Sequence, residues 1–124
     1  MACHEYVMKG DADVRMTRVE WPGRVMKVEL FGSLDIRGAA WVDLPLNAIA
    51  GAHDRLAIDL RGVDFLASIG VRTLVSVARV IGRRGGQVVF IGPNQTVAKV
   101  LSLTGLDTLA TIAEDDAAAQ AVFA

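Results

Sequence analysis

A single serine between a predicted strand and a predicted helix is the residue with the clearest chemical potential. Ser68 follows an apolar stretch and precedes a run with helical spacing. A sharp strand-to-helix turn that exposes a serine is typical of the nucleophile elbow of hydrolases. That motif begins with glycine, where this chain has Leu66, and its histidine follows the serine, whereas His4 and His53 both precede Ser68. Because a serine hydroxyl without a neighbouring base is a poor nucleophile, we predict that the protein is not an enzyme.

Two interpretations of Ser68 remain open at this stage. As an N-cap, its hydroxyl would accept a hydrogen bond from an unpaired backbone N–H and stabilise the helix by about 1 kcal/mol. As a phosphoacceptor, it would gain about two negative charges at the positive end of the helix dipole. Arg72 follows one helical turn later. Its side chain could reach a phosphate there, since helical side chains lean toward the N-terminus.

Other residue types with chemical potential do not combine into a motif. Cys3 and His4 are adjacent, but no partners follow them at metal-ligand spacing. Gly85 and Gly86 come after a predicted helix, whereas a phosphate-binding loop opens one. We therefore expect neither a metal nor another cofactor.

The spacing of the hydrophobic residues predicts the strands and helices that position Ser68. Two alternating runs from Val14 to Phe31 flank a Pro-Gly turn and predict an antiparallel hairpin. Helical spacing follows over 36–49, where Pro45 predicts either a kink near 43–44 or a separate helix that begins at the proline. Strands at 56–60, 87–91 and 109–113 then alternate with helices at 68–84, from 94 to 105, and from 115. The helix at 68–84 ends in Arg83 and Arg84, which indicate a solvated helix end or, alternatively, a binding patch.

This order, β-β-α-β-α-β-α-β-α, predicts an α/β domain with a mixed sheet and helices packed on it. Residues 1–13 form a loose lead-in that could include a short edge strand, and residues 14–124 form the domain. Trp41 could be a docking aromatic or be buried beneath its helix.

Composition limits the function classes. The chain has 124 residues, 52% of them hydrophobic and 22% charged, with a net charge of −1. One compact domain is expected from that length, and a near-neutral chain lacks the field that collects nucleic acids or anionic membranes. The single cysteine excludes an internal disulfide. No apolar run approaches the ~20 residues of a membrane span, and no signal-peptide pattern opens the chain, so we expect a cytoplasmic protein.

Four motifs together resemble a known family. GSLD at 32–35, AIDLRGVDFLASIG at 57–70, RRGGQVVFIGPN at 83–94 and LTGLDTLA at 103–110 look like a STAS domain (sulfate transporter and anti-sigma factor antagonist). The resemblance runs from Val14 to Ala113 in the family's order and spacing. It implies a small sheet with helices, an edge hairpin and a serine at the start of the second helix.

In the antagonist branch of that family, a partner that is both a kinase and an anti-sigma factor phosphorylates this serine. The unphosphorylated antagonist captures the partner and frees the sigma factor, and the phosphorylated form releases it. The resemblance implies Ser68 as the phosphoacceptor of a regulatory protein that acts as a monomer without contacting nucleic acid. The partner-binding positions implied with it are Asp35, Ala67, Ile69, Gly70 and Arg72.

The sequence departs from the family pattern at two of these positions. The family places aspartate before the serine and Ser or Thr after it, where this chain has Ala67 and Ile69. These changes favour an alternative, an accessory subunit of a lipid-transporting ABC system without a phosphorylation cycle. Arg72 suggests a third possibility, a stressosome-like scaffold.

Overall fold

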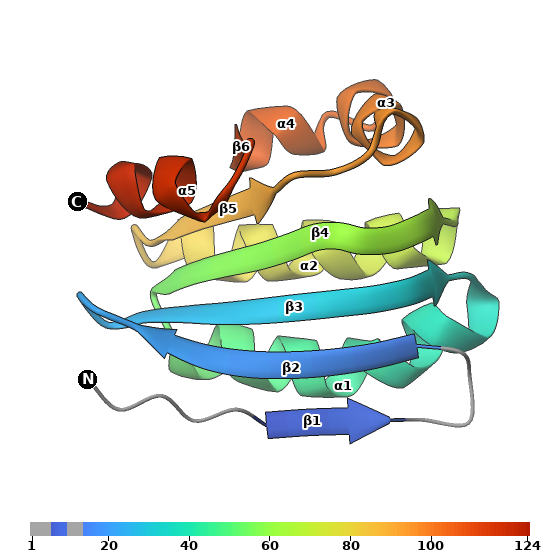
Figure 1. Cartoon of the computed structure of the whole chain (residues 1–124), viewed down its shortest axis with the longest axis horizontal. Helices are drawn as coiled ribbons and strands as arrows, with labels where there is room; N and C mark the ends of the chain where they lie inside the picture. Colours follow the sequence, from blue (N-terminus) through green and yellow to red (C-terminus); the bar gives the residue numbers. More distant parts are fainter. Residues whose placement is uncertain (1–5, 10–13) are drawn as a thin grey trace.

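The computed structural model describes residues 6–9 and 14–124 of the chain. One six-stranded sheet has its strands in the order β1-β2-β3-β4-β5-β6 (Figure 1). The strands are β1 (Tyr6–Lys9), β2 (Val14–Trp21), β3 (Val25–Leu34), β4 (Arg55–Leu66), β5 (Gln87–Ile91) and β6 (Thr111–Ala113). The helices are α1 (Ile36–Ala52), α2 (Ser68–Arg83), α3 (Gln95–Leu103), α4 (Leu106–Leu109) and α5 (Asp116–Phe123).

The sheet is mixed, as the sequence predicts. β1, β2 and β3 pair antiparallel, whereas β3, β4, β5 and β6 pair parallel. The predicted hairpin is β2–β3, and its tight turn places both Gly23 (φ 83°) and Arg24 (φ 62°) in the left-handed region. Parallel neighbours need a crossover, and α1 and α2 supply the crossovers from β3 to β4 and from β4 to β5.

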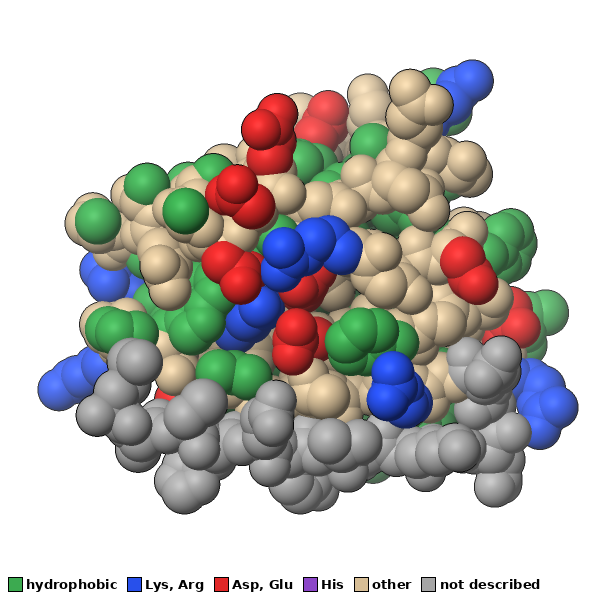
Figure 2. Space-filling model, in the orientation of Figure 1, with side chains coloured by type: hydrophobic (Ala, Val, Ile, Leu, Met, Phe, Trp, Pro, Cys, Tyr) green, Lys and Arg blue, Asp and Glu red, His purple; other side chains and the backbone are tan. Residues whose placement is uncertain are grey.

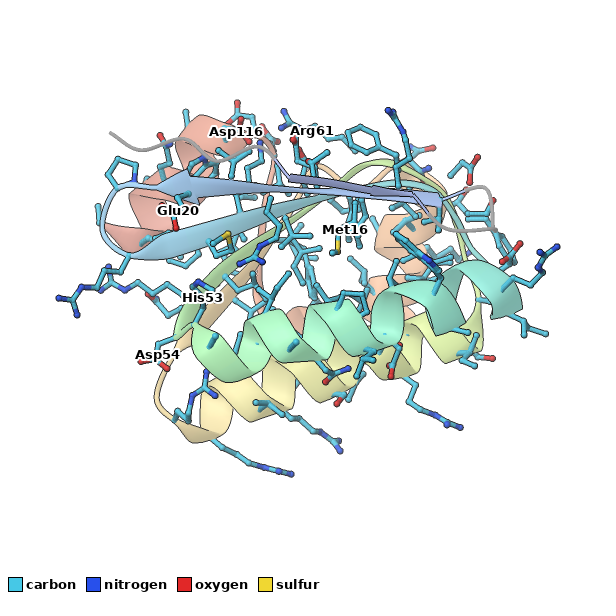
Figure 3. All side chains as sticks on the ribbon, turned by 90° about the horizontal axis from the view of Figure 1, so that it is seen from below. Met16, Glu20, His53, Asp54, Arg61 and Asp116 are labelled. Atoms are coloured by element: carbon cyan, nitrogen blue, oxygen red, sulfur yellow. The ribbon has the colours of Figure 1, made fainter. Side chains whose placement is uncertain are left out.

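The two faces of the sheet are covered differently. α1 and α2 lie side by side on one face, and α5 lies on the other (Figures 1 and 3). The main core lies beneath α1 and α2, and residues of α3 and α4 join it. A smaller apolar cluster lies beneath α5, where Ala119 and Phe123 pack on Ala57 and Val89. Near the start of β3, the side chains on both faces of the sheet are buried, because both faces are covered there.

Two features differ from the sequence-based expectations, and one that the sequence left open is present. α1 continues through Pro45 as one helix, so the prediction of a separate helix beginning there is wrong. Proline removes a single backbone donor, and Val42, Leu46 and Ile49 are buried on both sides of it. The short α4 was not predicted because four residues carry no helical period. Of the predicted lead-in, the structure describes Tyr6–Lys9 as the edge strand β1, while Cys3 and His4 lie outside the described residues.

Arg84 fastens the ends of the two long helices to each other. Its Nη2 donates to the carbonyls of Ala50 and His53, each at 2.6 Å, and its Nε donates to Asp54 at 3.0 Å. The last carbonyls of a helix have no partner within the helix, so a guanidinium there satisfies them and complements the dipole. Arg84 is therefore a structural residue at the end of α1, not merely a solvated one.

Candidate partner-docking site

The first turns of α1 and α2 meet at one edge of the sheet. β3 and β4 are parallel neighbours with Leu34 opposite Leu66, so the residues that follow each strand emerge together. The N–H of Ala67 donates to the carbonyl of Leu34 at 2.9 Å. The sequence motifs around Asp35 and Ser68, which are more than 30 positions apart, are thereby brought to the same edge.

Asp35 is the N-cap of α1. One of its carboxylate oxygens accepts a hydrogen bond from the N–H of Gly38 at 2.8 Å. Gly38 is required because a Cβ at this position would overlap the carbonyl of Ser33. The Ser33 hydroxyl in turn donates to Asp64 at 2.8 Å. Asp35 is exposed and so presents a fixed negative charge beside the start of α2.

Ser68 is the first residue of α2, not its cap. The N-cap is Ala67, whose φ of −80° and ψ of 165° are extended and whose side chain makes no capping bond. The N-cap interpretation of Ser68 is therefore wrong by one position, because a cap must have a non-helical backbone. The Ser68 side chain is exposed and makes no hydrogen bond to any described residue. The first backbone bond of the turn runs from Val71 N–H to Ala67 at 3.0 Å.

The other predicted partner-binding residues differ in exposure. Gly70 is buried, and a Cβ there would lie 2.8 Å from Leu66 and 3.1 Å from Leu34. It therefore sets the position of α2. Ala67 and Ile69 are half-buried, whereas Arg72 is exposed and forms no ion pair within the described parts of the chain.

Two exposed apolar side chains adjoin this edge. Ile36, the first residue of α1, is 73% exposed, and Phe65, near the end of β4, is 49% exposed. Large exposed apolar side chains grouped in this way are typical of interaction surfaces. We define Asp35, Ile36, Phe65, Ser68 and Arg72 as the Ser68 surface. Neither Ile36 nor Phe65 gives a signal of exposure in the sequence, because Ile36 continues a helical run and Phe65 lies beyond the strand predicted at 56–60.

A polar seam holds α1 and α2 in register behind this surface. The Thr73 hydroxyl, in a residue only 3% exposed, donates to Asp43 at 2.7 Å, and the Ser76 hydroxyl donates to Asn47 at 3.1 Å. Trp41, on the same helix as Asp43, is half-buried and packs against the main core. This agrees with the burial alternative for Trp41.

A second polar group lies on the sheet face opposite α1 and α2, and sequence reasoning missed it. Lys27 is 5% exposed, and its Nζ lies 3.0 Å from Asp116, 3.5 Å from Asp59 and 3.6 Å from Glu29. Arg61 bridges Asp59 and Asp116 at 2.7 and 2.9 Å. Figure 2 shows these charges gathered near the middle of this face, and Figure 3 shows Arg61 beside Asp116 at the start of α5. We call these five residues the charge network.

The charge network shifts the ionisation of its members. Burial alone would raise the pKa of Asp59, but hydrogen bonds from Arg61, with the positive charges of Arg61 and Lys27, outweigh it and hold the pKa below its ordinary value. Hydrogen bonding to Asp59 raises the pKa of Arg61. Both groups are therefore fixed in their charged forms at neutral pH, and they fasten α5 to the sheet.

Neither a metal centre nor a membrane-spanning helix emerges from the residues that the structure describes. No group of three His, Cys, Asp or Glu side chains among them could hold a metal ion. None of their helices has both the length and the apolar character needed to cross a bilayer.

A mixed sheet with two helices on one face, and an exposed serine and a capping aspartate at one edge, defines a small α/β domain. A family model described as "Mlab, STAS domain" matches residues 17–112. The chain belongs to the STAS domain family, as its motifs predict. No protein with a curated description matches it by sequence.

Several solved structures share this fold. An anti-sigma factor antagonist from Mycobacterium paratuberculosis is 24% identical with a TM-score of 0.76, over 94% of this chain and 98% of that one. An anti-sigma factor antagonist (STAS) domain protein from Planctomyces limnophilus is 23% identical with a TM-score of 0.77, over 93% and 100%. The Bacillus cell fate determinant SpoIIAA, in its phosphorylated form, is 22% identical with a TM-score of 0.67, over 86% and 98%.

Proposed function

We propose that this protein is an anti-sigma factor antagonist of the cytoplasm that binds a kinase-type anti-sigma factor through the Ser68 surface. The observation that carries the proposal is the exposed Ser68 hydroxyl, which has no partner in the described structure, at the start of a helix without a side-chain cap. Membership of the STAS family and the likeness in fold to antagonists support it.

Phosphorylation of Ser68 would make this surface strongly anionic. In the unmodified protein, Ile36 and Phe65 offer apolar area for docking beside a neutral hydroxyl. A phosphoserine adds about two negative charges at the edge that already carries the Asp35 carboxylate. Burying these charges against a partner costs desolvation energy and adds repulsion. The unpaired N–H groups of α2 and the guanidinium of Arg72 would stabilise the phosphorylated free protein.

Affinity capture from the native cell tests this proposal. The bait is the full chain as wild type, Ser68→Ala or Ser68→Asp, with Ser102→Asp on the exposed face of α3 as the matched control. We expect wild type, Ser68→Ala and Ser102→Asp to retain an anti-sigma factor with a kinase domain, and Ser68→Asp to lose it. Mass spectrometry of the wild-type bait should find phosphate on Ser68. Equal retention by both aspartate variants would refute the switch.

The second candidate is an accessory subunit of a lipid-transporting ABC system. The family model that matches is described as "Mlab, STAS domain" and not as an antagonist. Ala67 and Ile69 also leave Ser68 without polar neighbours in the sequence. In the same capture experiment, this candidate predicts a transporter ATPase held equally by wild type and Ser68→Asp, with no phosphate on Ser68.

A further inference from the structure

The end of the domain opposite Ser68 contains a group of cavities centred on one histidine. The largest, of about 680 Å³, lies between the β2–β3 turn at Gly23 and Arg24 and the start of β4 at Asp54 and Arg55. Two further cavities of about 370 and 300 Å³ adjoin it, and His53 lines all three. Figure 3 shows His53 at the end of α1, facing the strand that carries Glu20.

The largest cavity has an excess of positive charge. Arg24 and Arg55 line it, and its one carboxylate, Asp54, is already paired with Arg84 at 3.0 Å. Arg55 uses its Nη1 to donate to the carbonyls of Gly23 and Phe123, at 3.3 and 3.1 Å. A guanidinium carries five N–H donors, so Arg55 is held in place by one nitrogen while others remain for a ligand.

Arg24 is unusual in both backbone and side chain. Its φ of 62° is the left-handed conformation that few residues other than glycine adopt. It is the only non-glycine residue in that region among those the structure describes. Its side chain forms no hydrogen bond or ion pair with residues 14–124, whose side chains the structure describes. An arginine at a position suited to glycine, beside a cavity and without a partner among those residues, indicates a role in binding.

His53 and the adjoining walls add the remaining parts of a ligand site. The Nδ1 of His53 lies 3.0 Å from the carbonyl of Ile49, which it can satisfy only as a donor, so the Nε2 of the neutral ring is left as an acceptor for an N–H or O–H group of a ligand. The smaller cavities have apolar walls that include Val25, Met26 and Ile49. A few convergent polar groups beside apolar walls, in a volume of several hundred Å³, are typical of sites for small molecules.

We propose that this cavity group binds a small organic anion, with a phosphate, sulfonate or carboxylate head between Arg24 and Arg55. The apolar body of the ligand lies along the walls of the adjoining cavities. Glu20, which lines only the 370 Å³ cavity, keeps the anionic head in the largest one. Guanidinium groups suit such heads because their planar fork matches the oxygen geometry. The proposal does not depend on the role of Ser68.

The test uses two dyes that differ in charge. The full chain is titrated with 8-anilino-1-naphthalenesulfonate and with its uncharged analogue N-phenyl-1-naphthylamine, and amide NMR shifts locate the bound dye. We expect the sulfonate to bind at least tenfold more tightly than the neutral dye, with the largest shifts at residues 23–25 and 52–55. Equal affinities, or shifts centred on Ile36 and Phe65, would overturn the proposal.

Variants of Arg24 separate binding from stability. Arg24→Gly removes the side chain and relieves the left-handed backbone, so we expect its urea midpoint to equal or exceed that of wild type. The same variant should lose sulfonate binding by tenfold or more, whereas Arg24→Lys should retain part of it. The matched control is Arg79→Gln, because Arg79 is an exposed arginine of α2 and glutamine keeps that helix intact. Undiminished binding by Arg24→Gly would contradict the assignment.

Discussion

Replacing Lys27 by methionine tests whether the charge network stabilises the fold. Methionine keeps most of the apolar stem but removes the ammonium group, which leaves Arg61 alone with three carboxylates. Removing one partner of a buried ion pair costs about 3–5 kcal/mol because the other charge stays buried without compensation. Asp59 has a side chain only 6% exposed but keeps its hydrogen bonds from Arg61, so the cost lies below that range, and the side chain of Asp116 is 44% exposed, so its pair contributes at most about 1 kcal/mol. We therefore expect a loss of about 1–2 kcal/mol.

The assay is urea unfolding at pH 7, followed by far-UV circular dichroism. Lys99→Met on the exposed surface of α3 is the matched control and should change the free energy of unfolding by less than about 0.5 kcal/mol. The slope of the transition should be unchanged, since the same surface is exposed on unfolding. A Lys27→Met loss no larger than that of Lys99→Met would refute the reasoning that Lys27 stabilises the buried carboxylate of Asp59.

Acid unfolding gives an independent measurement of the same network. The folded state lowers the pKa of Asp59. Its contribution to stability is therefore fully present above the pKa of the unfolded chain, about 3.9, and is lost as pH falls through the lower folded value. In Lys27→Met the folded pKa of Asp59 moves upward. The variant should therefore show a smaller acid-dependent loss of stability than wild type between pH 5 and pH 2, as measured by the urea midpoint at each pH.

Three smaller predictions concern the elements that position the two ends of the domain. Gly70→Ala should lower the free energy of unfolding by about 1–3 kcal/mol, because its Cβ displaces α2 from Leu34. The change in NMR shifts should extend to Ser68. Arg84→Met should lower the free energy of unfolding by about 1–2 kcal/mol, because charged hydrogen bonds are lost from a side chain whose 36% exposure limits their contribution. Amide exchange at the end of α1 should become faster. Asn94→Ala should lower the free energy of unfolding by about 1 kcal/mol, because the cap of α3 is lost. The urea midpoint should fall accordingly.

The local signals in the sequence were sufficient for most of the fold. The hairpin was predicted from alternation around a Pro-Gly turn, and Asn94 and Asp115 were correctly placed at the starts of their helices. These features depend on residues within a few positions of each other. The length of β4 was underestimated, since the structure extends it from Arg55 to Leu66. Register shifts against β3 break its alternation near Gly62, so the periodic pattern ended early.

The candidate sites were predicted less completely, because their parts are distant in the sequence. The place of Ser68 between strand and helix singles it out, but its interpretation as an N-cap is one residue late. The charge network joins Lys27 to Asp116, 89 positions away, and no local spacing reveals such a pair. One signal was present: Asp59 interrupts an otherwise apolar strand, and a buried carboxylate needs a partner.

The glycines at the starts of α1 and α2 have a consequence for how the Ser68 surface can diversify. Gly38 and Gly70 occupy the same position in their helices, the third residue, and each meets the end of β3, where a Cβ would overlap Ser33 at Gly38 and crowd Leu34 at Gly70. The backbone of that edge is thus fixed by contacts that leave Ile36 and Ser68 outside the packing. Substitutions at those exposed positions cost the fold little. Such a platform lets partner specificity drift between related proteins while the scaffold stays constant.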